Sequence, residues 1–355
     1  MTTPLGIHQV LGGAAPWDAI TNHALAAQQV IRAMGYRSEI FADRWHLSPA
    51  IAHRVLEHHR WPGIAQRADR AIIHYSIDSP AFDLALDKAE RIGMHHHNVT
   101  PPELLWRDAP AVALQCQTGI EGLRRMVPQI DVAAAVSEFN AQELRRAGYA
   151  EPRVIGILRG PLSRRKRQRD HRDQTLRLLF VGRGIPNKRQ DALILALAAL
   201  REAGVAAQLR LVGGWGSCRP YLERCRRLVR ELDLVNDVVF LGSIDDDSLA
   251  QEYEDADVFV CMSEHEGYCV PIIEAMAHDL PVVALAAGAV PETLGRGGVL
   301  VETLQPSLVA EAVMLATDER LAGRLTEGRA HQLAIHSPEV TAARLRKFVR
   351  ELAEC

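Results

Sequence analysis

The chain of 355 residues is 48% hydrophobic and 24% charged, which is typical of a globular protein with room for two domains. Its formal net charge of −3 argues against bulk binding of nucleic acid. The six scattered cysteines form no C-x-x-C pair, which favours reduced thiols over a disulfide framework or a zinc site. The first residues show no signal peptide, and the most apolar run, 192–200, is too short to cross a membrane. We therefore expect a cytoplasmic protein with at most peripheral contact at the inner membrane face.

The chain opens with a pattern typical of a Rossmann-like unit. A short apolar run over 5–10 leads into Gly12 and Gly13, and apolar residues at helical spacing predict a helix over 17–34, ended by Gly35. The turn lacks the G-x-G-x-x-G pattern, so it does not by itself indicate a dinucleotide site. A plain tight turn is the alternative to a ligand-binding role. Further strands are expected at 71–76, 91–95 and 131–136, with helices at 81–89 and 137–147.

Three consecutive histidines, His95, His96 and His97, close the strand expected at 91–95. Adjacent residues of a strand point to opposite faces, so this tract cannot present three metal ligands together. We interpret His95 and His96 as packing residues of the core or its rim. The role of His97 depends on the segment that it begins, which reads H-N-V-T-P.

A strongly basic run without apolar periodicity occupies residues 163–173. Its place between two arrays of strands and helices predicts an interdomain linker over 161–174. A solvated connector is the simplest interpretation. The alternative is attraction to anionic lipid headgroups, because clusters of basic residues hold proteins to membrane surfaces.

The second array begins with an apolar run over 176–181 that predicts a buried parallel strand. This strand leads into Gly182 and Arg183 and on to Lys188, after which a helix is expected. The two cations then lie at the carboxyl end of a strand, where α/β folds bind ligands. Together they can neutralise a diphosphate. Arg189, in contrast, can be explained as an ordinary surface cation.

The most informative stretch, residues 263–277, joins an acidic, glycine-containing turn to a helix that starts near Pro271. The backbone amides of Gly267, Tyr268 and Cys269 precede this helix. A helix N-terminus carries partial positive charge that suits a phosphate. We therefore expect an anion site at this point.

Two acids accompany that anion site. Glu266 lies in the turn, and Glu274 lies one turn inside the helix. Because carboxylates accept hydrogen bonds, the hydroxyls of a sugar and a ribose are their natural partners. The alternative is an ordinary helix start whose acids complement the helix dipole.

Several of these segments resemble retaining glycosyltransferases of the GT-B fold, family 4. Glu266 and Glu274 match the Glu-x7-Glu signature, and residues 181–188 match the V-G-R-x4-K segment. The segment from His97 is similar to the H-N-[IV]-T-P motif of bacterial polysaccharide enzymes that include mannosyltransferases, and residues 136–140 match V-S-x-[FY]-N. The resemblance spans nearly the whole chain and is strongest over 178–292.

The resemblance implies an α/β protein with two Rossmann-like domains that face each other across a cleft. An N-terminal acceptor domain is expected at 1–160, and the C-terminal helix at 338–355 is expected to pack back onto it. The basic linker at 161–174 would lead to a nucleotide-sugar donor domain at 175–337.

The same resemblance implies roles for individual residues. The imidazole or the backbone carbonyl of His97 would lie near the reacting sugar. Arg183 and Lys188 would stabilise the leaving diphosphate, and Glu266 would hold sugar hydroxyls. Glu274 would hold the ribose. The implied donor-binding residues are Gly12, Gly13, Gly267, Tyr268, Cys269, Val270 and Glu274.

Three further aspartates depart from simple expectations. Asp255 and Asp257 resemble the D-x-D metal motif of the other large glycosyltransferase fold, GT-A. They lie where a helix meets a strand, without further oxygen ligands, so we expect no metal there. Asp279 stands where the family usually has glycine at a helix end, and aspartate tolerates the left-handed conformation that such an end often needs.

The expected activity is retaining transfer of a hexose from a nucleotide-diphosphate sugar to a glycan or glycolipid acceptor, in the synthesis of cell-surface polysaccharide. The donor GDP-mannose is inferred from the enzymes that the chain resembles, and no cofactor, metal or nucleic acid is expected. Two alternatives stay open. One is a nucleotide-sugar epimerase or a phosphorylase on the same fold, although no pyridoxal-binding motif is evident. The other is a non-catalytic partner subunit.

Overall fold

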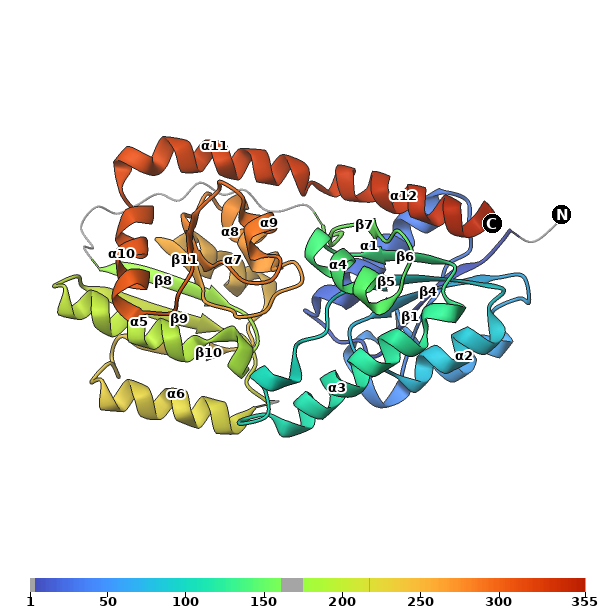
Figure 1. The fold of residues 1–355 in the computed structure, drawn as a ribbon, viewed down its shortest axis with the longest axis horizontal. Coiled ribbons are helices and arrows are strands. Elements are labelled where there is room, and N and C mark those ends of the chain that lie inside the picture. Colours follow the sequence, from blue (N-terminus) through green and yellow to red (C-terminus); the bar gives the residue numbers. More distant parts are fainter. Residues whose placement is uncertain (1–3, 161–174, 217, 355) are drawn as a thin grey trace. The chain divides into compact units, whose positions relative to one another are not determined.

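A computed structural model describes residues 4–160, 175–216 and 218–354. The described chain divides into two compact units, each with its own parallel sheet (Figure 1). The first unit comprises residues 4–99, 114–160 and 336–354, and the second comprises 100–113 and 175–335. The basic run at 163–173, expected to be a linker, lies outside the described residues.

The first unit contains a seven-stranded sheet in the order β3-β2-β1-β4-β5-β6-β7, with every pair parallel. The order reverses between β1 and β4, and ligands of open α/β sheets bind at such switch points. Its strands are β1 Ile7–Leu11, β2 Ile40–Ala42, β3 Leu56–Glu57, β4 Arg70–Tyr75, β5 Arg91–His96, β6 Val132–Ala135 and β7 Arg153–Val154. Its helices are α1 Ala19–Ala33, α2 Pro80–Lys88, α4 Glu138–Ala147, α12 Pro338–Glu354 and α3 Pro110–Arg125, whose first turn clusters with the second unit.

The C-terminal helix α12 completes the core of the first unit. Leu345, Phe348, Val349 and Leu352 of this helix are buried against Ile7 of β1 and other apolar residues. At the helix surface, the guanidinium of Arg153 pairs with the carboxylate of Glu351 at 2.9 Å. Burying four large apolar side chains contributes several kcal/mol by the usual value of about 1.5–3 kcal/mol each. The last helix is therefore an integral part of the first unit.

The second unit contains a six-stranded parallel sheet in the order β10-β9-β8-β11-β12-β13, with a switch point between β8 and β11. Helices lie on both sides of this sheet (Figure 1). Its strands are β8 Leu176–Val181, β9 Ala207–Val212, β10 Val238–Gly242, β11 Val258–Cys261, β12 Val282–Leu285 and β13 Val299–Val301. Its helices are α5 Gln190–Glu202, α6 Arg219–Glu231, α7 Asp246–Asp255, α8 Val270–Ala277, α9 Val290–Leu294, α10 Pro306–Ala316 and α11 Glu319–Ile335.

Local sequence explains where several helices begin and end. Asp18 caps α1 by accepting a hydrogen bond from the backbone N–H of Thr21 at 2.8 Å, and Gly35 follows the helix with φ 92°. Asp279 adopts φ 58° after α8, which confirms the left-handed conformation expected there. Its carboxylate also pairs with the guanidinium of Arg329 at 2.6 Å.

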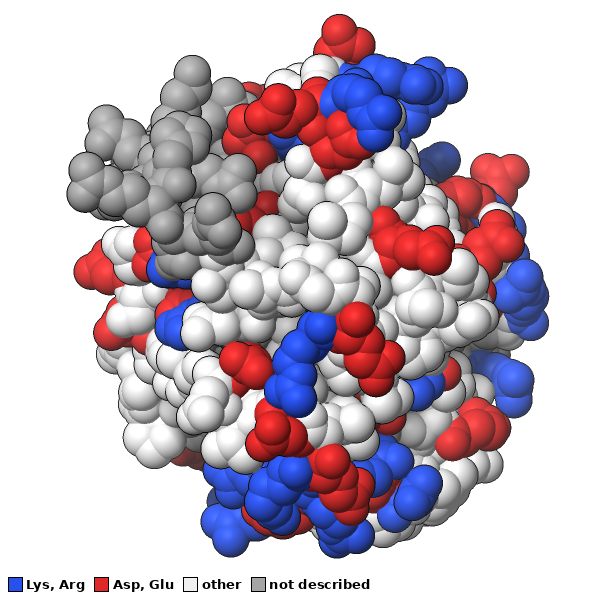
Figure 2. Space-filling view, turned by 90° about the vertical axis from the view of Figure 1, so that its left-hand side faces the viewer, with Lys and Arg blue, Asp and Glu red and all other residues white. Residues whose placement is uncertain are grey.

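Charges of both signs are mixed on the face of the molecule drawn in Figure 2, and uncharged residues fill the area between them. No helix in the described part of the chain is both long enough and apolar enough to span a membrane.

Candidate functional site

The loops after β8 and β11 meet at the switch point of the second sheet. The β8 loop carries Lys188 at the end of a short 3-10 helix, Pro186–Lys188, and the β11 loop carries Glu266. Because β8 and β11 are neighbouring parallel strands, their carboxyl ends lie at the same edge of the sheet. The topology therefore brings together two residues that are 78 positions apart in the chain.

Lys188 and Glu266 form an ion pair, with 2.6 Å between the lysine Nζ and the glutamate Oε1. Their side chains are only 18% and 11% exposed. Burial alone would lower the pKa of Lys188, but the nearby Glu266 carboxylate reverses the effect and the pKa lies above its ordinary value. The lysine is therefore charged at neutral pH. No described residue occupies Oε2 of Glu266, which leaves that oxygen free to accept a hydrogen bond from a ligand.

A second set of contacts ties the same two loops together. The guanidinium of Arg189 pairs with Glu264 at 2.8 Å and with Asp191 at 3.1 Å. The backbone N–H of Glu264 donates to the carbonyl of Asn187 at 2.8 Å. The interpretation of Arg189 as an ordinary surface cation is therefore wrong, because this residue has φ 52° and links both loops.

Arg183 lies in the same loop but differs from Lys188. Its side chain is exposed, and no described carboxylate pairs with it. Its backbone carbonyl accepts a hydrogen bond from the side chain of Gln190 at 2.9 Å, which holds the loop. Arg183 is therefore the cation of this edge whose charge no described residue neutralises.

Helix α8 begins at Val270 with Pro271 in its first turn, as its sequence predicted. Tyr268 and Cys269 just before it are buried, and Cys269 adopts φ 59°. The thiol of Cys269 lies 3.8 Å from that of Cys261 at the end of β11. Two of the cysteines that looked scattered in the sequence therefore meet beside the ion pair.

Glu274 lies inside α8 and has a partner that the sequence did not suggest. The hydroxyl of Tyr253 in α7 donates to its Oε2 at 2.8 Å. The Tyr253 ring in turn stacks on the imidazole of His278, with ring centroids 5.1 Å apart. Tyr253 thus orients the carboxylate to which a role on the ribose is attributed.

The loop after β12 supports Glu266 from the backbone side. The N–H of Ala289 donates to the carbonyl of Glu266 at 2.9 Å. Gly288 adopts φ 57°, and a Cβ at this position would lie 2.4 Å from the same carbonyl oxygen. Only glycine fits this close approach without displacing the backbone of Glu266.

We expect Gly288→Ala to lower the free energy of unfolding of the second unit by about 2–3 kcal/mol, from left-handed strain and the backbone clash together. Gly204→Ala is the matched control, because Gly204 has φ 79° but nothing within 4 Å of its Cβ position. In that control the free energy of unfolding should fall by only about 1 kcal/mol, the cost of the left-handed conformation alone. Urea denaturation of both variants measures the difference. Equal losses in the two would mean that the loop adapts to the clash.

Asp257 does not lie at this edge. Its carboxylate accepts the backbone N–H of Arg177 at 2.8 Å, at the amino end of β8 and β11. Asp255 ends α7. The D-x-D pair therefore belongs to the end of the sheet opposite the loops that carry Lys188 and Glu266.

In the first unit, Gly12 and Gly13 lie just after β1, at the switch point of that sheet. A Cβ on Gly13 would lie 2.9 Å from the Cβ of His46, and the N–H of the next residue, Ala14, donates to the His46 carbonyl at 3.0 Å. Gly13 thus permits a close approach of two loops, which is the structural alternative to ligand binding. Gly12 has room for a Cβ at ordinary contact distance, 3.4 Å from Ser79.

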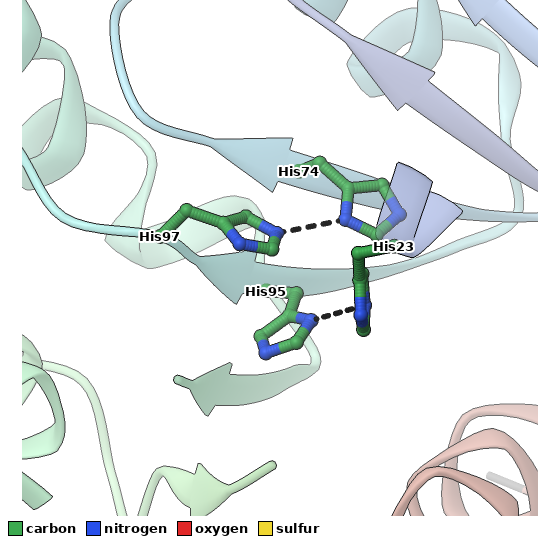
Figure 3. A group of neighbouring side chains, drawn as sticks. All are labelled: His23, His74, His95 and His97. Carbon is green, nitrogen blue, oxygen red and sulfur yellow. Dashed lines mark hydrogen bonds between the residues drawn. The ribbon is translucent and has the colours of Figure 1, made fainter. Parts of the chain in front are cut away.

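Four histidines of the first unit gather together (Figure 3). His95 lies in β5, His97 follows the end of that strand, His74 comes from β4, and His23 comes from α1. One ring nitrogen of each lies within 4.8 Å of those of the others. The four rings are buried, and burial is the largest cause that lowers their pKa values, to about 4 for His95 and well below 6.5 for the others. All four are therefore neutral at pH 7.

His96 points away from this cluster, as the alternation along a strand predicts. Its Nε2 lies 3.5 Å from the carboxylate of Glu143, and its side chain is buried, in agreement with a packing role. The interpretation of His95 as a packing residue was incomplete. Its ring is buried too, but it hydrogen-bonds to His23 at 3.1 Å.

The turn after His97 depends on two asparagines. Asn98 adopts φ 95°, and its side-chain oxygen accepts a hydrogen bond from Asn140 at 3.0 Å. Ser137 caps α4 by accepting from the N–H of Asn140 at 3.2 Å, as the sequence indicated. The V-S-x-[FY]-N segment therefore does more than cap a helix, because its asparagine also holds the residue next to His97.

The structure brings together Lys188, Glu266, Cys269 and Val270 at one edge, with Arg183 and Glu274 on the same loop and helix. Sequence reasoning missed Tyr253, His23, His74 and also Gln9 of β1, whose side-chain oxygen lies 2.9 Å from Nε2 of His74. One available signal was that His74 occupies the end of the strand expected at 71–76, as His95 does on the next strand. His23 and Gln9 carried no such signal.

Comparison with known proteins adds independent evidence. Residues 175–318 match the family model described as Glycosyl transferases group 1. The GDP-mannose-dependent alpha-(1-6)-phosphatidylinositol monomannoside mannosyltransferase of Mycobacterium tuberculosis is 32% identical over 184 residues, 49% of this chain and 47% of that protein. The D-inositol 3-phosphate glycosyltransferase of Thermomonospora curvata is 32% identical over 198 residues, 54% of this chain and 46% of that protein. The chain thus spans about half the length of these curated relatives.

Among solved structures, HepE of Anabaena in complex with UDP and glucose superposes with a TM-score of 0.73 at 16% identity. The match covers 98% of this chain and 100% of that one, so it establishes the fold. The region that matches the family model holds the ion pair, Arg183 and Glu274. The chain therefore has the GT-B fold, and its residues 175–318 match the family model Glycosyl transferases group 1.

Proposed function

We propose that the protein is a retaining glycosyltransferase that moves a hexose from a nucleotide-diphosphate sugar to a glycan or glycolipid acceptor. The observation that carries the proposal is the buried Lys188–Glu266 pair beside the start of α8. It offers a cation, a helix N-terminus and a free carboxylate oxygen at one edge of the sheet. A nucleotide-diphosphate sugar presents the matching groups, which are a diphosphate and several hydroxyls.

Departure of the leaving group places negative charge on the diphosphate. Arg183, Lys188 and the α8 N-terminus stabilise that charge, which is the kind of electrostatic assistance that lowers barriers most. Oε2 of Glu266 accepts a hydrogen bond from a sugar hydroxyl while Lys188 holds Oε1 in place. Glu274, oriented by Tyr253, accepts from the ribose.

His97, Gly12 and Gly13 complete the proposal in the first unit. The motif that His97 begins assigns it to the reacting sugar, and Gly12 and Gly13 follow β1 at the switch point of the sheet, where open α/β sheets bind ligands. No carboxylate pair like that of a retaining glycosidase is evident among these residues. Same-face attack assisted by the donor phosphate is therefore the mechanism we propose.

The donor and acceptor are inferred from relatives. Several that the chain resembles are named as GDP-mannose-dependent mannosyltransferases that act on phosphatidylinositol mannosides. The fold neighbour HepE was solved with UDP and glucose. We propose GDP-mannose as the donor and a glycolipid or glycan of the cell surface as the acceptor, with the enzyme acting at the cytoplasmic face of the membrane.

A thermal-shift panel tests the donor class. GDP, UDP and ADP are compared, each alone and with its sugars, and a ligand at 100 times its Kd should stabilise the protein by about 2.7 kcal/mol. We expect GDP and GDP-mannose to raise the melting temperature most. A response to UDP alone would keep the activity and change the donor. No response to any nucleotide would contradict the proposal.

Two alternatives predict different outcomes. An epimerase converts the nucleotide sugar without releasing nucleoside diphosphate, and a phosphorylase with pyridoxal phosphate shows an absorbance band in the pure protein. A non-catalytic partner subunit binds without turnover. Slow release of nucleoside diphosphate from the preferred donor, measured without an acceptor, separates all three from a transferase.

A further inference from the structure

The four-histidine cluster is anchored by backbone groups whose hydrogen-bonding direction is known. The N–H of Leu158 can only donate, and it lies 2.8 Å from Nδ1 of His23. The carbonyl of Ile155 can only accept, and it lies 2.9 Å from Nε2 of His95. The carbonyl of Ala24 accepts from the side-chain nitrogen of Gln9 at 3.0 Å. These three anchors determine where the ring protons lie, because a neutral imidazole has one N–H and one lone pair.

The first chain of hydrogen bonds begins and ends at backbone groups. Since His23 accepts at Nδ1, its proton is on Nε2, which lies 3.1 Å from Nδ1 of His95. His95 therefore accepts at Nδ1 and donates from Nε2 to the Ile155 carbonyl. Every ring nitrogen of these two histidines has a partner of the right kind.

The second chain of hydrogen bonds ends at a ring nitrogen that has no partner among the described residues. With its nitrogen bound to Ala24, Gln9 turns its oxygen toward Nε2 of His74 at 2.9 Å, so that nitrogen carries the proton. Nδ1 of His74 then accepts from Nε2 of His97 at 2.9 Å. This leaves a lone pair on Nδ1 of His97, a buried atom that has no hydrogen-bond partner among the described residues.

A metal ion is a poorer explanation of this arrangement. A ligating histidine needs a lone pair toward the ion, with its other N–H bound to an outer acceptor. His74 and His95 meet that requirement, but His23 does not, because the Leu158 N–H occupies its outer nitrogen. The proton positions instead describe two oriented hydrogen-bond chains, of which one leads to His97.

We propose that Gln9 and His74 are positioning residues that hold His97 in the Nε2–H tautomer, so that Nδ1 presents a lone pair to a hydroxyl of the substrate. The inference rests on the proposed function for the identity of that hydroxyl, which belongs to a sugar. The assignment of the His97 tautomer does not depend on the proposed function. An imidazole held in this way accepts a hydrogen bond and does not donate one.

The tautomer can be measured without any substrate. In protein with 15N-labelled histidine, long-range 1H–15N correlation spectra distinguish a protonated ring nitrogen from a bare one, and His97→Gln assigns the signals. At pH 7.5 we expect Nδ1 of His97 to be bare and Nε2 to be protonated. A protonated Nδ1 in the wild-type protein would overturn the proposal, whether or not the variants below fold.

Variants of Gln9 test the cause. Gln9→Met keeps the shape but removes the acceptor for His74, so His97 should become a mixture of tautomers and kcat should fall about tenfold, the value of one hydrogen bond. His23→Asn changes only the other chain and should leave the His97 signals in place. An unchanged His97 spectrum in Gln9→Met would contradict the relay.

Addition of zinc distinguishes the hydrogen-bond relay from a metal site. When Zn²⁺ is added to protein treated with EDTA, we expect unchanged ring signals and no retained zinc after desalting. Retention of one equivalent, with joint shifts of the His74, His95 and His97 signals, would show a metal site and overturn the relay. Failure of the proposed function would look different, because the tautomer would be as described while no nucleotide sugar bound.

Discussion

Lys188→Met is expected to lower kcat/KM for sugar transfer by about 10²- to 10³-fold, the usual loss when a preorganised charge on the leaving group is removed. The same change should lower the free energy of unfolding of the second unit by about 3 kcal/mol, because it leaves a buried carboxylate on Glu266 without its partner. Both side chains are mostly buried, so solvent cannot replace the lost contact. Steady-state kinetics and urea denaturation measure the two effects.

The double variant Lys188→Met/Glu266→Gln separates catalysis from stability. Replacing both members of a buried ion pair with neutral groups of similar shape is often close to neutral for stability. We expect the double variant to unfold near the wild-type midpoint and yet to stay as inactive as the single variant. Recovery of activity together with stability would show that the pair only supports the fold.

Arg210→Gln is the matched control. Arg210 of β9 pairs with Glu252 of α7, and their side chains are 28% and 13% exposed, close to the values for Lys188 and Glu266. This pair does not involve the loops after β8 and β11. Its loss should cost stability by a similar mechanism and leave kcat/KM within about twofold of wild type.

The second large effect is loss of stability of the first unit in mild acid. The folded-state pKa values of His23, His74 and His97 lie well below 6.5, and that of His95 is about 4. Between these values and 6.5 the unfolded chain binds more protons, so stability falls as pH decreases. Each histidine contributes up to about 1.4 kcal/mol per pH unit, which for His95 alone amounts to about 3 kcal/mol at pH 4.

Amide hydrogen exchange measures this loss of stability in the first unit, and the second unit serves as an internal control. After correction for intrinsic rates, the amides of β4 and β5 should lose protection steeply between pH 6.5 and pH 4.5. The amides of β8 and β9 should lose less, because these strands contain no histidine. His95→Gln should make the pH dependence of β5 shallower. Parallel losses in both units would show that the histidines titrate normally.

The edge of the second sheet could be predicted because its residues follow strands directly. A buried strand over 176–181 places Lys188 at its carboxyl end, and the strand before residue 263 does the same for Glu266. The switch point then brings the two ends together. The sequence did not show that the two side chains pair with each other, because that depends on the conformation of two loops.

Helix α3 shows a limit of reading propensities. No helix was predicted over 110–125, where Gly119 and Gly122 interrupt the apolar pattern. The structure explains both glycines. The hydroxyl of Tyr75 donates to the carbonyl of Gly119 at 2.6 Å, and a Cβ on Gly122 would lie 2.6 Å from that hydroxyl. Tertiary packing against Tyr75 therefore explains why α3 contains two glycines, although glycine lowers helix propensity.

The histidine cluster shows a different limit. The rule that adjacent residues of a strand face opposite sides correctly separated His96 from its neighbours. It did not reveal that His95 and His97 share a face with residues of β4 and α1. His23 is 72 residues away from His95, and only the packing of α1 on the sheet makes them neighbours. Such a constellation becomes visible only once the fold is known.

We propose that the Lys188–Glu266 edge binds and activates a nucleotide-diphosphate sugar. The most direct test follows release of nucleoside diphosphate from the donor that the thermal-shift panel selects, for wild-type protein and for folded Lys188→Met/Glu266→Gln. We expect release by the wild type and a loss of at least about 10²-fold in the double variant. Equal release by both proteins, or none by the wild type with any donor, would contradict it.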